Sequence, residues 1–206
     1  MAARGIACWI VLLGLLASVT AAGFRIVEAA YTHKGGIPRG LAPTLAVASD
    51  GTVAGFPMTS RASALQVFRS EAAGLLGIRL QVVTWAHVEH QGRISWVLRE
   101  VLDGGRLSPP LRQGRVKCDK LLDWGFAELV FEPIEDSEGR DYRLELYAPD
   151  VPIDRCVGFR LVRGGSPTAR LTLRGGPGSE HLGELVDGTA REENSLKFEI
   201  YHRPGD

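Results

Sequence analysis

The stretch 126–147, FAELVFEPIEDSEGRDYRLELY, decides the fold that the sequence predicts. Apolar side chains recur at every second position from Phe126 onward, and again from Tyr142 onward. This period of two is typical of β-strands, whose successive side chains point to opposite faces. Residues 136–139, Asp-Ser-Glu-Gly, have the composition of a tight turn. We therefore expect two strands joined by a turn, the first of them buried on both faces because apolar residues occupy both of its alternating sets.

The same alternation recurs in five other segments, separated by breaks rich in glycine and proline. This pattern predicts a mainly β chain, an antiparallel β-sandwich of jelly-roll-like shape over residues 64–206. Residues 63–76 fit either a helix or a strand, and we favour a strand followed by an irregular crossing. The five segments are 78–82, 94–98, 157–161, 171–173 and 196–200.

Residues 5–24 carry no charge and lie between Arg4 and Arg25. Twenty helical residues span about 30 Å, the thickness of a bilayer core. The run is either a cleaved secretory signal or a retained transmembrane helix, and we favour an anchor over residues 1–24. Small residues would let it pack closely against other membrane helices: Gly5, Gly14, Ala17 and Ala21.

Residues 25–63 are predicted to form a connector between the anchor and the sandwich, because glycine, proline and alanine interrupt regular structure there. Within it, residues 44–48 and 52–56 flank Asp50-Gly51, a strong turn signal, and predict a short hairpin.

The composition excludes two classes of protein. Lysine and arginine total 24, aspartate and glutamate also total 24, and the net charge is therefore zero. A nucleic-acid binder normally has a basic excess, so we expect no nucleic-acid partner. Apolar residues make up 45% and charged residues 23%, which are values of a globular chain and not of a disordered one.

Two of the three cysteines, Cys118 and Cys156, belong to the predicted sandwich. They either form a disulfide in an oxidising compartment or remain two buried thiols, and the sequence leaves both open. No CxxC motif is present, so a zinc ribbon is not supported.

No catalytic or metal-binding motif is evident. The acidic run 136–141 lacks the ligand spacing of a calcium loop, and we interpret it as a hairpin turn. His87 and His90 have no evident third ligand and are interpreted as solvated loop residues. The common nucleophile and phosphate-loop motifs are also missing. We therefore predict a protein that is not an enzyme and needs no metal or cofactor.

Aromatic side chains are the main candidates for binding. They lie at strand ends or opposite the stronger apolar stripe, where they would stack on sugars, anchor a protein interface or pack at the rim of the core. Trp96 aligns with Ile94 and Leu98 and is expected in the core. Arginine outnumbers lysine, a weak sign of an interface. The four candidates are Trp85, Trp124, Tyr147 and Tyr201.

Over residues 64–202 the chain resembles a bacterial extracytoplasmic jelly-roll module, often joined to membrane glycosyltransferases and other envelope proteins. The resemblance implies a carbohydrate-binding-module-like shape. It rests on Gln66 and Phe68; Leu75, Ile78 and Leu80; Gly92, Ile94 and Leu98; and Phe131, Pro133, Ile134, Asp136, Ser137, Gly139 and Tyr142.

Together these features predict a single-pass protein of the bacterial cytoplasmic membrane, with its C-terminal domain in the periplasm or outside the cell. The first functional hypothesis is an accessory or scaffolding subunit of a larger membrane complex, with integral membrane subunits as partners and the bilayer contacted by the N-terminal helix. The alternative is a glycan-binding module that works with a membrane glycosyltransferase.

Overall fold

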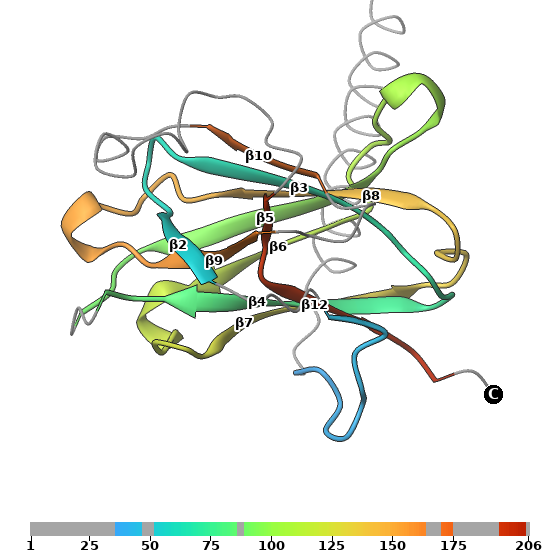
Figure 1. The fold of residues 1–206 in the computed structure, drawn as a ribbon, viewed down its shortest axis with the longest axis horizontal. Coiled ribbons are helices and arrows are strands. Elements are labelled where there is room, and N and C mark those ends of the chain that lie inside the picture. Colours follow the sequence, from blue (N-terminus) through green and yellow to red (C-terminus); the bar gives the residue numbers. More distant parts are fainter. Residues whose placement is uncertain (1–35, 47–51, 86–88, 164–169, 175–193, 205–206) are drawn as a thin grey trace, which may run out of the picture.

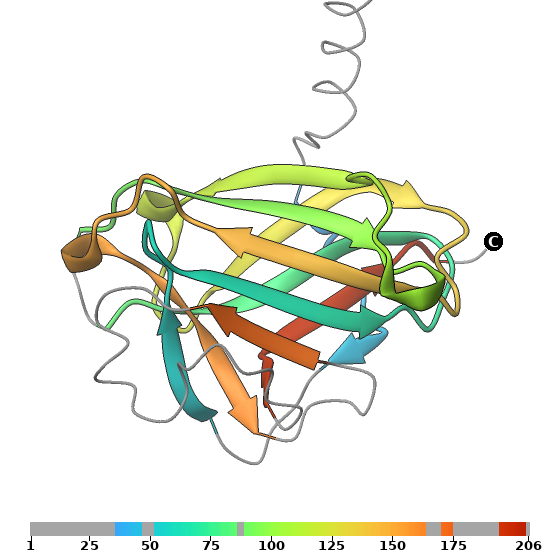
Figure 2. The same ribbon diagram turned by 90° about the horizontal axis from the view of Figure 1, so that it is seen from above.

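The computed structural model describes residues 36–46, 52–85, 89–163, 170–174 and 194–204. These residues form two antiparallel sheets stacked face to face (Figures 1 and 2). The protein is therefore mainly β with a sandwich-like architecture, as the alternating pattern predicts. Three short 3₁₀ turns connect strands: η1 (Asp103–Gly105), η2 (Cys118–Lys120) and η3 (Ile153–Arg155).

The first sheet is built around the long strand β4 (Leu75–Val83), which pairs with other strands on both of its edges. In this sheet the strand order is β1 (Leu45–Ala46), β12 (Phe198–His202), β4, β9 (Gly158–Arg163) and β11 (Asn194–Leu196). Two further strands join this sheet off the main path: β7 (Phe126–Ile134) pairs with β4, and β2 (Thr52–Pro57) pairs with β9.

The second sheet is a simple path of five strands. Their order is β10 (Arg170–Arg174), β3 (Ser63–Arg69), β8 (Asp141–Tyr147), β5 (Arg93–Glu100) and β6 (Arg112–Lys117). As predicted, β3 is a strand, and an irregular crossing separates it from β4.

The core lies between the sheets and is rich in phenylalanine. Alternate side chains of each strand enter it: in β8, Tyr142, Leu144 and Leu146 are buried, whereas the residues between them are partly exposed. Both sheets contribute aromatic side chains to this core, and the burial of such large apolar groups is a major source of stability in a sandwich. The buried phenylalanines are Phe56, Phe68, Phe131, Phe159 and Phe198.

Two details of the predicted strands are wrong. β7 is buried on one face only: Ala127, Leu129 and Phe131 are about 1% exposed, but Phe126 is 39% exposed. On the outward face the Phe126 ring lies 6.0 Å from the Arg79 guanidinium carbon and stays partly exposed. The predicted hairpin in the connector is also wrong, because β1 pairs with β12 and β2 pairs with β9.

Strand β6 was not predicted from the sequence. Its residues, RQGRVK, include one large apolar side chain, so no alternation marks it. It is an edge strand that pairs only with β5, and an edge strand needs few core-facing residues.

None of the helices among the described residues has the length and apolarity to cross a membrane. The expected anchor, with Gly5, Gly14, Ala17 and Ala21, lies outside the residues that the structure describes.

Candidate functional site

Three of the four candidate aromatics are exposed in the structure. Trp85 is 41% exposed, Trp124 is 60% exposed and Tyr147 is 40% exposed. Tyr201 is instead 2% exposed, so it offers no free face for a ligand. The Arg79 guanidinium covers its ring at 5.0 Å from the centroid and donates to the hydroxyl at 3.0 Å. As expected, Trp96 is a core residue.

Trp85 follows the end of β4 and rests on two glycines of neighbouring strands. A Cβ placed on Gly55 would lie 2.9 Å from Cζ2 of the indole, and one placed on Gly158 would lie 2.5 Å from Cη2. Gly158 is paired with Val83, two residues before Trp85. Any side chain at either position would displace the indole, so both glycines form the floor of its site.

Trp124 stacks against Arg160 of β9. The guanidinium carbon lies 3.3 Å from the centroid of the Trp124 ring, a close cation–π contact. Asp123 Oδ1 lies 3.9 Å from Arg160 Nη2 and also accepts a hydrogen bond of 2.9 Å from the Thr84 backbone N–H. Asp123 thereby joins the loop that carries Trp85 to the loop that carries Trp124.

Both tryptophans have an unusual backbone. Their φ angles are 50° for Trp85 and 61° for Trp124, and no other non-glycine residue among those described has a positive φ. The left-handed region costs a residue with a side chain about 1–3 kcal/mol, and such strain concentrates at functional sites. The fold holds both indoles in place against this cost.

Two polar atoms of the same surface have no hydrogen-bond partner in the described structure: Gln81 Oε1 and Arg160 Nε. Gln81 is 8% exposed and lies directly across from the exposed Phe126 on β7. Buried polar groups are nearly always hydrogen-bonded, so unpaired atoms at one place indicate where a ligand or water completes the bonding. We call this set the tryptophan surface: Gln81, Trp85, Asp123, Trp124, Phe126 and Arg160.

The other candidates do not join this surface. Tyr147 belongs to β8 of the opposite sheet. The acidic run forms a turn, with Gly139 at a φ of 70°. The interpretation of this turn as a hairpin is wrong, because β7 pairs with β4 in the first sheet whereas β8 pairs with β3 and β5 in the second. The residue that accepts a backbone hydrogen bond there is Ser137, which bonds the Leu75 N–H at 3.0 Å. Among the described residues no cluster of His, Cys, Asp and Glu fits a metal ion, and His87 is outside them.

Cys118 and Cys156 are free thiols, both buried in the core. The backbone N–H of Cys118 bonds to Gly92, and the neighbouring Gln91 bonds to Arg155, which places the two cysteines on either side of one short segment. Burial, with smaller effects of Asp119 and Cys156, raises the pKa of Cys118 to about 11.

The partners of the two tryptophans were missed by sequence reasoning. Gln81 and Arg160 are outward residues of alternating strands, which look like ordinary solvated positions, and Gly55 belongs to the segment interpreted as a connector. Only strand pairing across the sheet brings them together. Comparison with known proteins finds no matching family model and no significantly similar curated protein.

Proposed function

We propose that this protein is a non-enzymatic glycan-binding module of the bacterial envelope, and that the tryptophan surface is its binding site. The observation that carries the proposal is the pair of strained, exposed indoles, Trp85 and Trp124, beside the unpaired Gln81 Oε1. A sugar ring has an apolar face that stacks on an indole and a polar rim of hydroxyls. A few placed polar groups beside apolar surface are the usual composition of such sites.

Each side chain has a role in this proposal. Trp85, supported from below by its two glycines, stacks on one sugar unit. Trp124 is held by Arg160 on one face and presents its remaining exposed surface to a neighbouring unit. Asp123 and Gln81 supply acceptors for sugar hydroxyls.

The resemblance to extracytoplasmic jelly-roll modules supports the same reading. We place the sandwich on the outer side of the cytoplasmic membrane, anchored by residues 5–24, where envelope polysaccharides are available. A membrane glycosyltransferase is the partner that this arrangement suits.

Binding of the detergent-solubilised full chain to immobilised envelope polysaccharides and to a glycan array tests the proposal. We expect Trp85→Ala and Trp124→Ala each to weaken binding by about tenfold, as expected for the loss of one stacking aromatic. Tyr147→Ala is the matched control, since Tyr147 has the same exposure as Trp85 but lies on the other sheet. Binding that survives both tryptophan substitutions would exclude this surface as the glycan site.

A second function, an accessory subunit of a larger membrane complex, is favoured by a different observation. Leu122 is 76% exposed and neighbours Trp124, and Phe126 extends the exposed apolar area. Aromatic, leucine and arginine side chains together also suit a protein interface with integral membrane subunits. Native mass measurement of the detergent-extracted chain tests this function, and a monomer at every concentration together with glycan binding would reject it.

A further inference from the structure

The outer face of the second sheet carries a concentration of positive charge that the neutral composition conceals. On β5, Ile94, Trp96 and Leu98 point into the core, so Arg93 and Arg99 point outward. When the same alternation is applied to the other four strands, the five strands together have eight basic and two acidic outward side chains. The basic ones are Arg69, Arg93, Arg99, Arg115, Lys117, Arg143, Arg170 and Arg174, and the acidic ones are Asp141 and Glu145. We call this the basic face.

Three cations with no ion pair to another described residue lie at one edge of the basic face, the edge that β5 and β6 form. Arg93 is directly opposite Lys117 in the strand register, and Arg115 is opposite Ser95. Arg93, Arg115 and Lys117 are exposed, and none of the three has an ion pair with another described residue. Like charges directly opposite each other destabilise a sheet. The stability of the fold therefore gives no reason for this pair of like charges.

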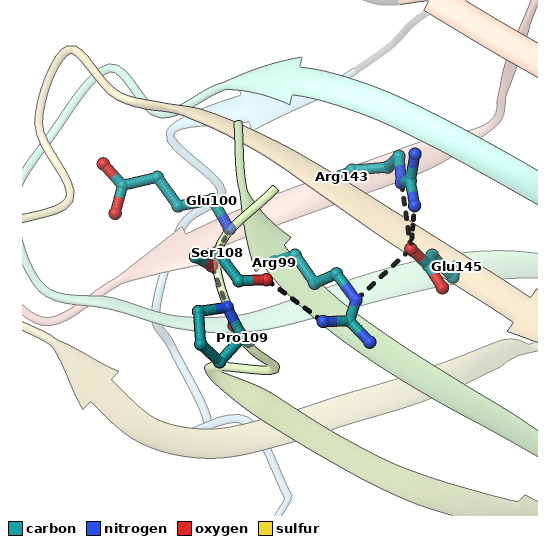
Figure 3. A network of polar contacts seen from close by, with 6 residues as sticks. All are labelled: Arg99, Glu100, Ser108, Pro109, Arg143 and Glu145. Carbon is teal, nitrogen blue, oxygen red and sulfur yellow. Dashed lines mark hydrogen bonds and ion pairs between the residues drawn. The ribbon is translucent and has the colours of Figure 1, made fainter. Parts of the chain in front are cut away.

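The middle of the basic face has more cations than carboxylates to pair with them. Arg99 is directly opposite Arg143, and both contact one carboxylate, Glu145, as Figure 3 shows. Arg99 Nε lies 3.5 Å from Glu145 Oε1, and Arg143 Nε lies 2.9 Å from the same atom. Arg99 also donates to the Ser108 carbonyl at 3.0 Å. These contacts hold Arg99 and Arg143 in position. The two arginines and the one glutamate together still carry a net positive charge.

We infer that the basic face docks on the anionic headgroups of a lipid bilayer. The cations are spread over all five strands, a width of about 19 Å at roughly 4.8 Å per strand spacing. A two-dimensional array matches a charged surface, whereas a linear polyanion would follow one row and leave the others unpaired. Tyr147, 40% exposed at the end of the middle strand of the face, is a residue type that favours the headgroup level. Seven of the eight cations are arginines, which bind phosphate oxygens in pairs.

Docking through the basic face is compatible with the proposed function. Of that proposal, it requires only that the protein is located at the membrane. The tryptophan surface belongs to the outward side of the other sheet, so both can be occupied at the same time. The sandwich would lie with β5 and β6 on the membrane and Trp85 and Trp124 turned away from it.

Lysine footprinting of the full chain tests the inference with an internal control. The chain is reconstituted into lipid nanodiscs of phosphatidylcholine alone or of equal parts phosphatidylcholine and phosphatidylglycerol, and acetylation of each lysine is followed by mass spectrometry. We expect anionic discs to slow labelling of Lys117 about fivefold or more, and about 0.5 M salt to restore it. Lys197, which joins β11 to β12 of the first sheet, should be labelled equally in both discs.

Two matched double variants locate the effect. Arg93→Gln/Arg115→Gln should reduce the protection of Lys117 to less than about twofold, because two of its neighbouring cations are lost. Arg39→Gln/Arg106→Gln removes the same charge from exposed positions outside the face and should retain the protection. Neither pair should alter folding, since Arg93 and Arg115 have no ion pair to lose.

Several outcomes would overturn the inference. These are equal labelling of Lys117 in both discs, equal loss of protection in both variants, or protection by soluble polygalacturonate without protection by anionic discs. The last would assign the face to an acidic polymer. If the chain is not retained by neutral discs, the anchor proposal fails, and the same comparison is made with the chain added to vesicles of the two compositions.

Discussion

The Arg160 guanidinium lies 3.3 Å from the centre of the Trp124 ring, and this contact joins β9 to a loop that follows β6 in the chain. The Arg160 side chain is 12% exposed, so the cation is largely removed from water and its interaction with the ring is little screened. The strained backbone of Trp124 is retained because this contact and the Asp123 bonds hold its loop from both sides.

Replacement of Arg160 tests this contact. Arg160→Met keeps the length of the side chain but removes the charge, and we expect it to lower the free energy of unfolding by about 1–2 kcal/mol. Arg170→Met, at an exposed position on the other sheet, is the control and should change it by less than about 0.5 kcal/mol. Urea denaturation measures both, and an equal effect of the two substitutions would contradict a special role for the stacked pair.

The two glycines beneath Trp85 should differ in their tolerance of alanine. At Gly158 a Cβ would lie 2.3 Å from the Phe56 carbonyl oxygen, which is backbone, whereas at Gly55 it would meet only the side chains of Val83 and Trp85. We expect Gly158→Ala to cost more than about 3 kcal/mol and Gly55→Ala about 1–2 kcal/mol. Both should displace the indole and weaken glycan binding. Full binding by a folded Gly55→Ala protein would show that the position of Trp85 does not matter.

Because His202 is buried, we expect the protein to lose stability in acid. Its ring is 3% exposed and contacts Ser70 Oγ at 2.7 Å and Thr44 Oγ1 at 2.5 Å. Burial lowers the pKa of His202 below its ordinary value of 6.5, so the unfolded chain binds the proton more readily than the folded one. Stability is therefore complete above pH 6.5 and declines as the pH falls through the unfolded pKa toward the folded one.

Thermal unfolding between pH 7.5 and pH 5, values chosen as about one unit or more on either side of the ordinary histidine pKa, measures this effect. His202→Gln keeps a polar side chain but does not titrate, so its melting temperature should depend less on pH than that of the unmodified protein. Identical pH dependence of the two proteins would remove His202 as the cause.

The buried thiols should react slowly. With a pKa of about 11, Cys118 has about a hundredfold less thiolate near pH 8 than a cysteine with its ordinary pKa of 9.0. Alkylation by iodoacetamide in the native state should therefore be at least about a hundredfold slower than in urea. If Cys118 and Cys156 resist alkylation in urea until a reductant is added, the protein carries the disulfide that its sequence also allows.

The strands were predictable because their signal is local. In β8, alternation of Tyr142, Leu144 and Leu146 with charged residues is visible in seven residues of sequence, and the structure confirms it. β6 lacked this signal because an edge strand contributes little to the core. For Trp85 and Trp124 the sequence left open a binding surface or packing at the rim of the core, and only the structure shows that both are exposed. Tyr201 is buried because it packs with Ile37 and Leu76 and Arg79 of the adjacent strand β4 covers its ring.

The sequence by itself determined the class of the fold, since a period of two commits each segment to a strand with one core face. It also determined the neutral total charge and the aromatic candidates. Only the tertiary structure decided that the cations gather on one sheet face, and that Gly55, Gly158 and Arg160 surround the two tryptophans. The physical reason is that strand register joins residues far apart in the chain, such as Leu45 and Ile200, and no local pattern encodes which strands become neighbours.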